Sequence, residues 1–434
     1  MMRVALVNPT WRYDNSIYFG CRDPHLPIEF GCTQSKLEAA GHEVLLLDGQ
    51  LIEADHATLA EKVRRFRPQM TALVTAPTYL FWRCAPPELR VPADFLEQLD
   101  GDGGREVIVG PHGSVTPGPT LRKLDADLVV RGECEEVLAQ LCEADDPREV
   151  AGTAWLDGED VKVNGPQAAA AFVDQAALHW PDAWVQRHRH HHHRFDDAAR
   201  GPGAEVEASR GCPYNCSFCA KIDYRDAYRR RELQPLLDEI DGLIAQGVTY
   251  LYFIDEIFLP QKPLLEALVH RPVEFGVQTR IDLWSEPMLE LLGRAGCVSI
   301  EAGVESLTEE GRAELHKKCK MSTDDLARRL IAARRNVPFV QANLIATEGD
   351  DPALVAEWRE RLQAEDVWAN DPVPLYPYPS SPAYRERWGL PDDHAWERAH
   401  AFYLDQFDHF SDIQDQRPLP LQDLERHLAG SRHV

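Results

Sequence analysis

Short apolar runs alternate with longer amphipathic stretches along the first third of the chain. Helices are expected at residues 33–40 and 133–142. Strands are expected at the apolar runs, which are residues 4–7, 42–47, 71–75, 106–109 and 128–130. Continuous apolar strands that alternate with helices are typical of a parallel sheet covered on both faces. The pattern predicts a Rossmann-like α/β domain over residues 1–148.

Polar and glycine residues follow the predicted strands of this domain. Open α/β sheets bind ligands at the carboxyl ends of their strands. The residues at those ends are Asn8, Thr75, Gly110 and Gly132. A ligand of the first domain is therefore expected beside these four residues.

Residues 149–203 have the character of a connector. Residues 150–165 predict a β-hairpin, because Asp157-Gly158 is a turn signal between two short apolar-polar stretches. The rest has little periodicity and ends in a run of histidines and arginines at 187–194.

Alternation resumes at residue 204 with a longer period. Strands are expected at residues 204–209, 248–254, 273–279, 297–302, 338–345 and 366–375. Helices are expected at residues 232–246, 285–294, 307–316, 322–335 and 352–364. Six βα units predict a TIM-like barrel, full or partial, over residues 204–379. Residues 380–434 are mostly polar with aromatics, and a small helical extension is expected there.

Charge and hydropathy narrow the class of protein. The chain holds 46 Lys and Arg against 71 Asp and Glu, a formal net charge of −25. A surface with this much negative charge repels phosphate backbones and anionic lipid, which argues against a nucleic-acid or membrane partner. The N-terminal apolar run is too short for a signal peptide, and no apolar run is long enough for a membrane span. A cytoplasmic location and a small-molecule substrate are expected.

Three of the ten cysteines fall within eight residues, at Cys212, Cys216 and Cys219. Thiolates at spacings of four and three can wrap one loop around a metal. Zinc calls for a fourth ligand, and no Cys or His follows at finger-like spacing. A [4Fe–4S] cluster held by three thiolates leaves one iron open for a chelating molecule. A structural zinc loop and unpaired thiols are the alternatives.

The Cys-x3-Cys-x2-Cys spacing, with Phe218 before the last Cys and a Ser-Arg-Gly-Cys-Pro lead-in at 209–213, resembles the radical S-adenosylmethionine (SAM) superfamily. The first domain is similar to the cobalamin-binding domain of one subclass. The marks are Val-Asn-Pro at 7–9, Gly-His-Glu-Val at 41–44, Gly-Pro-His-Gly at 110–113 and Val-Arg-Gly-Glu-Cys-Glu at 130–135.

The resemblance implies cofactors and a reaction. The three cysteines hold a [4Fe–4S] cluster whose open iron binds SAM, and one electron from the cluster cleaves SAM to a 5′-deoxyadenosyl radical. The electron comes from an external donor of the flavodoxin or ferredoxin type. Cobalamin is the third implied cofactor, and methylation of carbon on a small molecule is the implied outcome.

The resemblance also assigns SAM contacts. They are Phe218, Asp255, Glu256, Gln278, Arg280, Glu305 and Asn343. Several of them have a structural alternative. Phe218 suits a core aromatic, the 255–256 pair suits a solvated acidic turn, and Arg280 suits a structural ion pair.

For cobalamin, the resemblance points to the carboxyl ends of the first sheet. The predicted contacts are Asn8, Thr75, Thr78, Gly110, His112 and Gly132. The best-known cobalamin ligand motif, Asp-x-His-x-x-Gly, is half present at Asp23-Pro24-His25, with Ile28 where Gly belongs. The subclass generally lacks that motif. His112 either approaches the corrin or caps its own loop.

The histidine run at 188–193 directly precedes the first barrel strand. A solvated linker is one interpretation. The others are a lid for an anionic substrate and a metal or cofactor ligand.

Several functions stay open on sequence grounds. The first is a cobalamin-dependent radical SAM methyltransferase, and the second is a radical SAM oxidoreductase, lyase or rearrangement enzyme that does not use cobalamin for methyl transfer. A tRNA methylthiotransferase is disfavoured by the acidic charge. An electron-transfer or metal-binding protein is the non-enzyme alternative.

Overall fold

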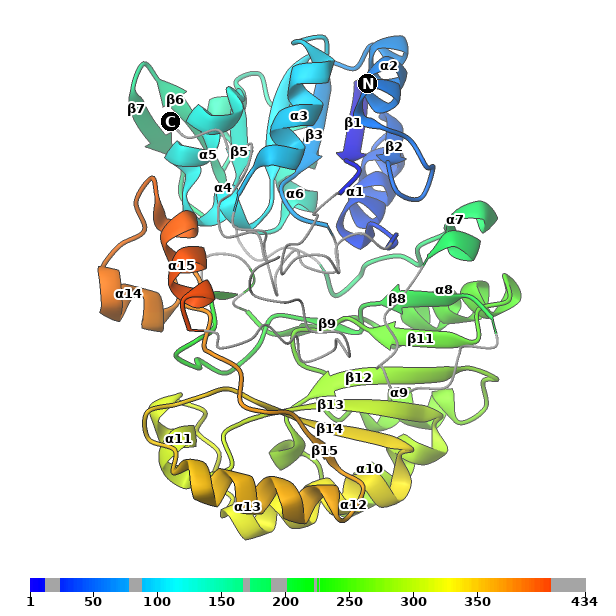
Figure 1. Ribbon diagram of the computed structural model, residues 1–434. Helices are drawn as coiled ribbons and strands as arrows, with labels where there is room; N and C mark the ends of the chain where they lie inside the picture. The colour runs from blue at the N-terminus through cyan, green and yellow to red at the C-terminus, as the bar shows by residue number, and fades with distance from the viewer. Residues whose placement is uncertain are drawn as a thin grey trace.

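The computed structural model describes residues 1–11, 24–77, 88–166, 172–188, 201–221, 225 and 227–406. Two sheets form two domains that lie one above the other in Figure 1. Among the described residues, no helix has the length and apolar character needed to cross a membrane.

The first domain is built on a seven-stranded sheet with the order β2-β1-β3-β4-β5-β6-β7. Its parallel strands are β1 (Arg3–Asn8), β2 (Glu43–Asp48), β3 (Met70–Val74), β4 (Arg105–Val109) and β5 (Leu128–Val130). The predicted hairpin is present as β6 (Thr153–Asp157) and β7 (Asp160–Val163), and it extends the sheet antiparallel to β5. The predicted parallel α/β sheet is confirmed.

Alternate residues of β1 explain why its apolar run is continuous. Val4 and Leu6 belong to one buried cluster, and Ala5 and Val7 belong to another. The two clusters lie on opposite faces of the sheet, because successive side chains of a strand point to opposite sides. Both faces are therefore covered, as the pattern predicted.

The helices of this domain are α1 (Ile28–Ala39), α2 (His56–Phe66), α3 (Arg90–Leu99), α4 (Pro111–Val115), α5 (Pro117–Leu124) and α6 (Cys134–Glu143). The sequence pattern missed α2 to α5 and placed the start of α1 five residues too late. Leu59, Ala60 and Val63 form the buried stripe of α2, and Asp55 caps it by accepting from Thr58 N at 2.8 Å. That signal was present in the sequence, whereas α4 has only five residues and shows no period.

The second domain is an open, six-stranded parallel sheet with the order β15-β14-β13-β12-β11-β8. The strands are β8 (Gly203–Val206), β11 (Tyr250–Phe253), β12 (Glu274–Thr279), β13 (Cys297–Glu305), β14 (Phe339–Leu344) and β15 (Trp368–Ala369). The predicted partial barrel is confirmed. The last strand is much shorter than expected, because Pro372 and Pro374 follow it and proline cannot donate to a ladder.

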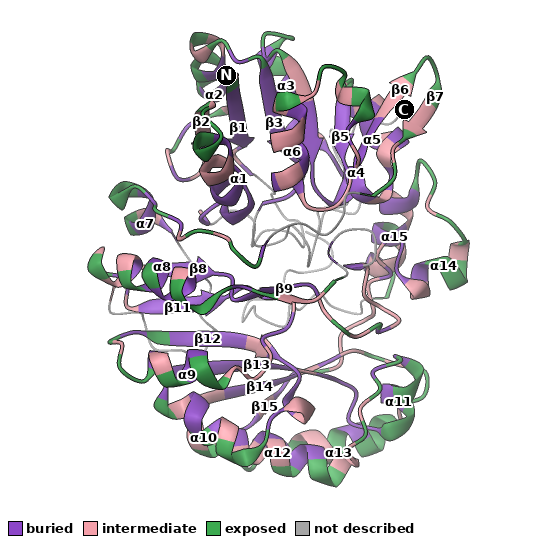
Figure 2. Cartoon of the chain, turned by 180° about the vertical axis from the view of Figure 1, so that it is seen from behind, coloured by how far each residue is buried: buried purple, intermediate pink, exposed green. Residues whose placement is uncertain are grey.

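The barrel helices pack outside the strands, with exposed outer faces along α12 and α13 (Figure 2). They are α8 (Leu233–Ala245), α9 (Lys262–Leu268), α10 (Glu286–Arg294), α11 (Glu309–Glu314), α12 (Thr323–Asn336) and α13 (Pro352–Gln363). Five of them match predicted helices, and α9 was not predicted. A further helix outside the prediction, α7 (Asp182–Arg187), lies in the connector.

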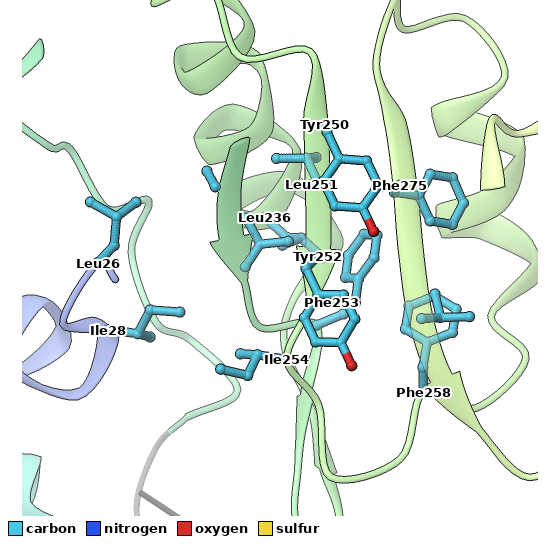
Figure 3. Packing of buried hydrophobic residues seen from close by; sticks show 14 of the residues in the cluster. Leu26, Ile28, Leu236, Tyr250, Leu251, Tyr252, Phe253, Ile254, Phe258 and Phe275 are labelled. Atoms are coloured by element: carbon cyan, nitrogen blue, oxygen red, sulfur yellow. The ribbon is translucent and has the colours of Figure 1, made fainter. Parts of the chain in front are cut away.

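One buried apolar cluster runs through both domains. Leu26 and Ile28, at the start of α1, belong to the same cluster as Leu236 and Ile254 of the barrel. Figure 3 shows these side chains facing one another beside the aromatic core of β11 and β12. Because the junction is a packed core, the two domains are held in one arrangement.

The predicted helical extension is present as α14 (Pro382–Trp388) and α15 (Ala395–Leu404). It touches both domains. Ala383 N donates to Ser217 O in the barrel domain at 2.9 Å, and Trp396 Nε1 donates to Thr116 Oγ1 in the first domain at 3.0 Å.

Candidate functional site

The three cysteines lie on a loop that follows the short strand β9 (Ser209–Arg210). Gly211 opens the loop with a φ of 76°, and a Cβ there would clash with the carbonyl oxygen of Ala227. Glycine is needed because it tolerates this left-handed conformation without a side chain. Glu256 Oε2 accepts from Gly211 N at 2.8 Å, which fixes the backbone directly before Cys212.

The thiols of this loop suit a metal cluster. Burial, together with the nearby Cys212 and Cys216, raises the pKa of Cys219 to about 12. Burial also raises the pKa of Cys212 and of Cys216. Three neighbouring thiolates are therefore costly without a compensating cation, and bound iron supplies that positive charge. The donor set fits an iron–sulfur cluster.

Asp255 and Glu256 follow β11, and their carboxylates accept hydrogen bonds from the backbone at the start of the cysteine loop. Asp255 Oδ1 accepts from Ala208 N at 2.9 Å, and its Oδ2 accepts from Ser209 Oγ. Burial raises the pKa of Asp255 well above its usual range. The contacts in the structure make this pair a support for the cysteine loop, and their contact to SAM stays a prediction.

Arg280 follows β12 and faces the cysteine loop. Its Nε and Nη2 donate to Asp282 at 3.1 and 2.8 Å, and its guanidinium lies 4.1 Å from the ring centroid of Tyr214. Its buried Nη1 and the buried Oε1 of Gln278 have no hydrogen-bond partner within the described part of the chain. Both atoms lie at the end of β12. Buried polar atoms without partners at this position fit a polar ligand such as the amino-acid part of SAM.

Glu305 ends β13 at an irregularity in its pairing with β14 and has a φ of 66°. Its carboxylate accepts from Lys317 Nζ, and both groups are nearly buried. The space they occupy exists because Gly303 has no side chain, since a Cβ there would lie 3.0 Å from Glu305 Oε1 and 3.3 Å from Lys317 Nζ. Strained residues of this kind concentrate at functional sites.

Lys317 was not predicted as a site residue. Its positive charge lowers the pKa of Cys216, against the larger raising effect of burial, which places it near the cysteine loop. Lys317 follows α11, and no local sequence pattern distinguishes it from its exposed neighbour Lys318.

The inner face of the barrel is polar near its centre. Asn343 Oδ1 accepts from Gln341 Nε2 at 2.6 Å, and Glu301 lies 3.5 Å from the hydroxyl of Tyr252. In most barrels this layer is filled by branched apolar residues. Phe218 lies half-buried on the cysteine loop. The SAM contacts of Asn343 and Phe218 stay predictions.

The described residues among those predicted for cobalamin lie where the parallel strands of the first sheet end. His112 contacts Thr75 Oγ1 at 3.0 Å through Nδ1, and its ring lies 4.3 Å from that of Trp396. Gly110 has a φ of 133°, and Gly132 N donates to Ser114 Oγ at 2.9 Å. His112 is therefore engaged in its own loop and with the C-terminal extension.

Asn8, at the same edge, bridges Asp48 and Trp11. Its Nδ2 donates to Asp48 Oδ2 at 2.6 Å, and its Oδ1 accepts from Trp11 Nε1 at 2.7 Å. Thr78, the remaining predicted contact, lies outside the described residues.

A buried charge network joins this edge to the cysteine loop. Arg210 donates to Glu135 at 2.5 Å and to Glu207 at 2.7 Å, and it is 2% exposed. Arg225 donates to Glu207 at 2.8 Å and lies 3.5 Å from Glu29. Glu29 and Glu135 belong to the first domain, so both arginines connect the two domains directly before and after the cysteines.

His188 and His25 form a second buried contact with the barrel. His25 Nδ1 lies 3.2 Å from Glu205 Oε1 on β8, and one ligand-type atom from each of His25, His188 and Glu205 lies within 4.8 Å of the others. Leu26 N donates to His188 Nδ1 at 3.1 Å, so neutral His188 carries its proton on Nε2. A ring nitrogen that holds a proton does not bind a metal, and we interpret this group as a buried packing contact between the first domain, the connector and β8.

This placement corrects two expectations. His188 is buried, which contradicts a solvated linker or a lid at that position, and the rest of the run at 190–193 lies outside the described residues. His25, from the half motif, is directed at the barrel strand.

The fold and the cysteine loop together define a class, a Rossmann-like domain followed by a partial barrel with a three-cysteine site at the strand ends. Residues 206–356 match the family model described as the Radical SAM superfamily. This match confirms the resemblance seen in the cysteine motif, and it makes the barrel domain of this chain a radical SAM domain.

Two curated relatives match along most of the chain. An anaerobic magnesium-protoporphyrin IX monomethyl ester cyclase of Cereibacter sphaeroides is 25% identical over 414 residues, which cover 89% of this chain. A hopanoid C-3 methylase of Methylococcus capsulatus is 25% identical over 366 residues, which cover 79% of this chain. The chain spans 63% and 64% of the lengths of these two relatives.

Two solved structures share the fold. The radical SAM methyltransferase TsrM from Kitasatospora setae, with cobalamin and a [4Fe–4S] cluster bound, has a TM-score of 0.68 at 20% identity and covers 88% of this chain and 77% of its own. The cobalamin-dependent radical SAM enzyme OxsB, with aqua-cobalamin bound, has a TM-score of 0.71 at 16% identity and covers 91% of this chain and 64% of its own.

Proposed function

We propose that this enzyme binds a [4Fe–4S] cluster, SAM and cobalamin, and that it methylates a carbon atom of a small molecule. The observation that carries the proposal is the contact between Arg210, two residues before Cys212, and Glu135, which follows the carboxyl end of β5. That contact brings the ligand-binding edge of the first sheet against the cysteine loop. In Figure 1 the strands of the first domain run toward the barrel domain.

The chain's own residues have separate tasks in this scheme. Cys212, Cys216 and Cys219 hold the cluster, while Asp255 and Glu256 hold the backbone that carries them. When bound, the cluster, SAM and cobalamin supply the electron, the radical and the methyl group. The protein positions them and keeps water out of the junction.

The ends of β12 and β13 provide the polar contacts for SAM. Nη1 of Arg280 is placed to donate to a carboxylate, because Asp282 fixes the other side of the guanidinium. Glu305 offers a carboxylate that suits an ammonium group, with Lys317 as its charge partner. These two groups bind and orient the amino-acid part of the ligand.

At the edge of the first sheet, Thr75, Gly110 and Gly132 offer a hydroxyl and close backbone approach to a flat ligand. His112 is buried against Thr75 and Trp396. It therefore shapes the wall of this site and is not expected to ligate cobalt.

The names of the relatives support the methyl-transfer part of the proposal. Hopanoid C-3 methylase and TsrM are named as methyl-transferring enzymes. The cyclase is not, and it favours the second candidate, a radical SAM oxidoreductase or rearrangement enzyme. An acidic surface suits a small-molecule substrate, and an external protein is the expected electron donor.

The test uses anaerobically purified protein with a reconstituted cluster. Incubation with dithionite and SAM is expected to release 5′-deoxyadenosine, and added cobalamin is expected to stay with the protein through gel filtration. SAM labelled in its methyl group is then incubated with a metabolite extract, and label is expected in a new carbon-methylated product. Cofactor retention without labelled product would favour the second candidate, and an absence of both cobalamin binding and SAM cleavage would refute the proposal.

A further inference from the structure

One aromatic side chain of the C-terminal extension, Trp396 of α15, packs against the first domain beside the residues predicted for cobalamin. The ring centroids of Trp396 and His112 lie 4.3 Å apart, and their planes are 34° from parallel. Trp396 is 6% exposed and His112 is 1% exposed, so both rings are almost fully removed from water. Close aromatic contacts of this kind favour one orientation of each ring.

The indole of Trp396 also reaches the backbone of His112 through one hydroxyl group. Trp396 Nε1 donates to Thr116 Oγ1 at 3.0 Å. The same hydroxyl donates to His112 O at 3.1 Å, and Thr116 N donates to that carbonyl at 2.8 Å. Trp396 therefore constrains the ring of His112 by packing and its backbone through Thr116.

The imidazole of His112 carries this constraint to the ends of two neighbouring strands. Its Nδ1 lies 3.0 Å from Thr75 Oγ1, directly after β3. Thr75 N donates to Val109 O, the last residue of β4, at 2.9 Å. Open α/β sheets bind their ligands where parallel strands end, so the orientation of this imidazole decides which polar groups are presented there.

The junction between the extension and the first domain is nearly filled. The cavity beside the two rings has a volume of about 10 Å³ and is lined by Trp396, His112, Thr120 and Lys123 among others. A space of that size holds about one water molecule. A smaller side chain at position 396 would open room for the imidazole to turn.

Two ion pairs that flank Trp396 in the sequence attach the start of α15 to α5. Arg122 Nη2 lies 2.7 Å from Asp393 Oδ1, and Lys123 Nζ lies 2.5 Å from Glu397 Oε1. Figures 1 and 2 show α15 beneath α4 and α5. The ion pairs keep the indole seated on the first domain.

We propose that Trp396 is a positioning residue of the cobalamin site. It fixes the imidazole of His112, and His112 in turn fixes the hydroxyl of Thr75 at the end of β3. Groups that are already fixed lose little freedom when the ligand binds, so the affinity for the ligand is higher. The inference rests on the proposed function, because the ligand in question is cobalamin.

The experiment measures hydroxocobalamin binding to the full chain with its cluster reconstituted. Equilibrium dialysis gives the Kd, and visible circular dichroism at saturation reports the surroundings of the bound corrin. For Trp396→Ala the Kd is expected to rise by about threefold to tenfold, and the circular dichroism spectrum is expected to change. Trp396→Phe keeps a ring against His112, so its Kd is expected to rise by less than about threefold.

Two comparisons separate positioning from a general loosening of the extension. Trp388→Ala removes a ring that packs inside the extension, 5.0 Å from Tyr384 and 5.4 Å from Phe402, and it is expected to leave the Kd and the spectrum unchanged. In a His112→Ala background, Trp396→Ala is expected to change the Kd by less than about twofold, because the indole acts through the imidazole.

Thr116→Val is a second variant that keeps the test open if Trp396→Ala does not fold. It removes the hydroxyl between the indole and the His112 carbonyl, and its Kd is expected to rise as well.

Three outcomes would overturn the positioning role. They are a normal Kd in Trp396→Ala, an equal rise in Trp388→Ala, and a full effect of Trp396→Ala in the His112→Ala background. Each of them requires that the unchanged enzyme binds hydroxocobalamin, so the proposed function stands. An unchanged enzyme that binds no hydroxocobalamin would instead refute the cobalamin part of the proposed function, and this inference with it.

Discussion

Arg210 Nη1 donates to Glu135 at 2.5 Å, and this ion pair joins the residues directly before the cysteine loop to the first domain. Both side chains are nearly buried, and Glu207 accepts a further hydrogen bond from the guanidinium of Arg210 at 2.7 Å. A buried charge that loses its partner is costly, whereas an exposed pair contributes little. Breaking this buried ion pair is therefore expected to cost far more than breaking a partly exposed ion pair on α6.

Removal of the arginine is the sharper test of that ion pair. Arg210→Met leaves Glu135 buried without its cation and leaves Glu207 with Arg225 alone, and a loss of about 3–5 kcal/mol in the free energy of unfolding is expected. The matched control is Glu136→Gln. Glu136 lies beside Glu135 on α6 and pairs at 2.5 Å with Lys36 of α1, which is partly exposed. That control is expected to cost less than about 1 kcal/mol. Urea denaturation measures both, and equal costs would contradict the network's role.

Iron retention tests the cysteine site. Cys216→Ala removes one of three thiolates, and the variant is expected to lose most of its bound iron and its visible absorbance after anaerobic reconstitution. Cys142→Ala, a half-buried cysteine on α6 in the first domain, is the control and is expected to keep both. Full iron content in the Cys216 variant would show that the cluster is held elsewhere.

The Nη1 group of Arg280, which does not contact Asp282, predicts that this residue contributes to the affinity for SAM. Arg280→Lys loses the Nη1 donor and the two-point contact with Asp282, so the Kd for SAM is expected to rise by about tenfold or more. Arg271 is a matched control, since it makes the same two-point contact with Asp241, at 2.7 and 2.8 Å, between α9 and β12. Arg271→Lys is expected to leave the Kd unchanged. Equilibrium dialysis with labelled SAM measures both, and a normal Kd in the Arg280 variant would remove it from the SAM site.

Asp48 predicts a pH dependence of stability. Burial raises its pKa from 3.8 to about 7, although hydrogen bonds from Leu51 N, Asn8 and Gln50 N oppose the shift. Between about pH 4 and pH 7, Asp48 is therefore protonated in the native state and ionised in the unfolded state. Stability falls as pH rises through that window, by up to about 1.4 kcal/mol per pH unit.

The comparison for Asp48 is with its amide. Asp48→Asn lacks the titrating carboxyl group. The difference in free energy of unfolding between the unchanged protein and this variant is therefore expected to change from pH 4 to pH 7 and to level off above pH 7. The control is Asp102→Asn, at an exposed carboxylate, which is expected to change the free energy of unfolding by less than about 1 kcal/mol. A pH-independent difference at Asp48 would mean that this carboxyl is ionised throughout.

Features encoded by neighbouring residues were predictable from the sequence. The cysteine spacing at 212–219 identified the loop, and the apolar runs located the parallel strands, because both signals are local. Residues 4–7 are an example, since their unbroken apolar run required two buried faces and both are present.

Features that depend on residues far apart in the chain were not predictable. Arg210 and Glu135 were both noticed as parts of motifs, but they lie 75 residues apart and no pattern links them. Lys317 and Lys318 are identical in sequence terms, and the left-handed turn at 316–318 decides which one is buried. The carboxylate of Asp255 was assigned to a ligand from its place at a strand end, whereas its contacts to Ala208 and Ser209 depend on how the next loop folds.

The hairpin of β6 and β7 has a consequence for how the molecule behaves in crowded solution. It covers the side of β5, a buried strand of three apolar residues whose open hydrogen-bonding groups would otherwise invite another chain. The new outermost strand, β7, is four residues long and carries Asp160 and Lys162. Short, charged border strands resist sheet-to-sheet aggregation, so the hairpin acts as a built-in guard of the first domain.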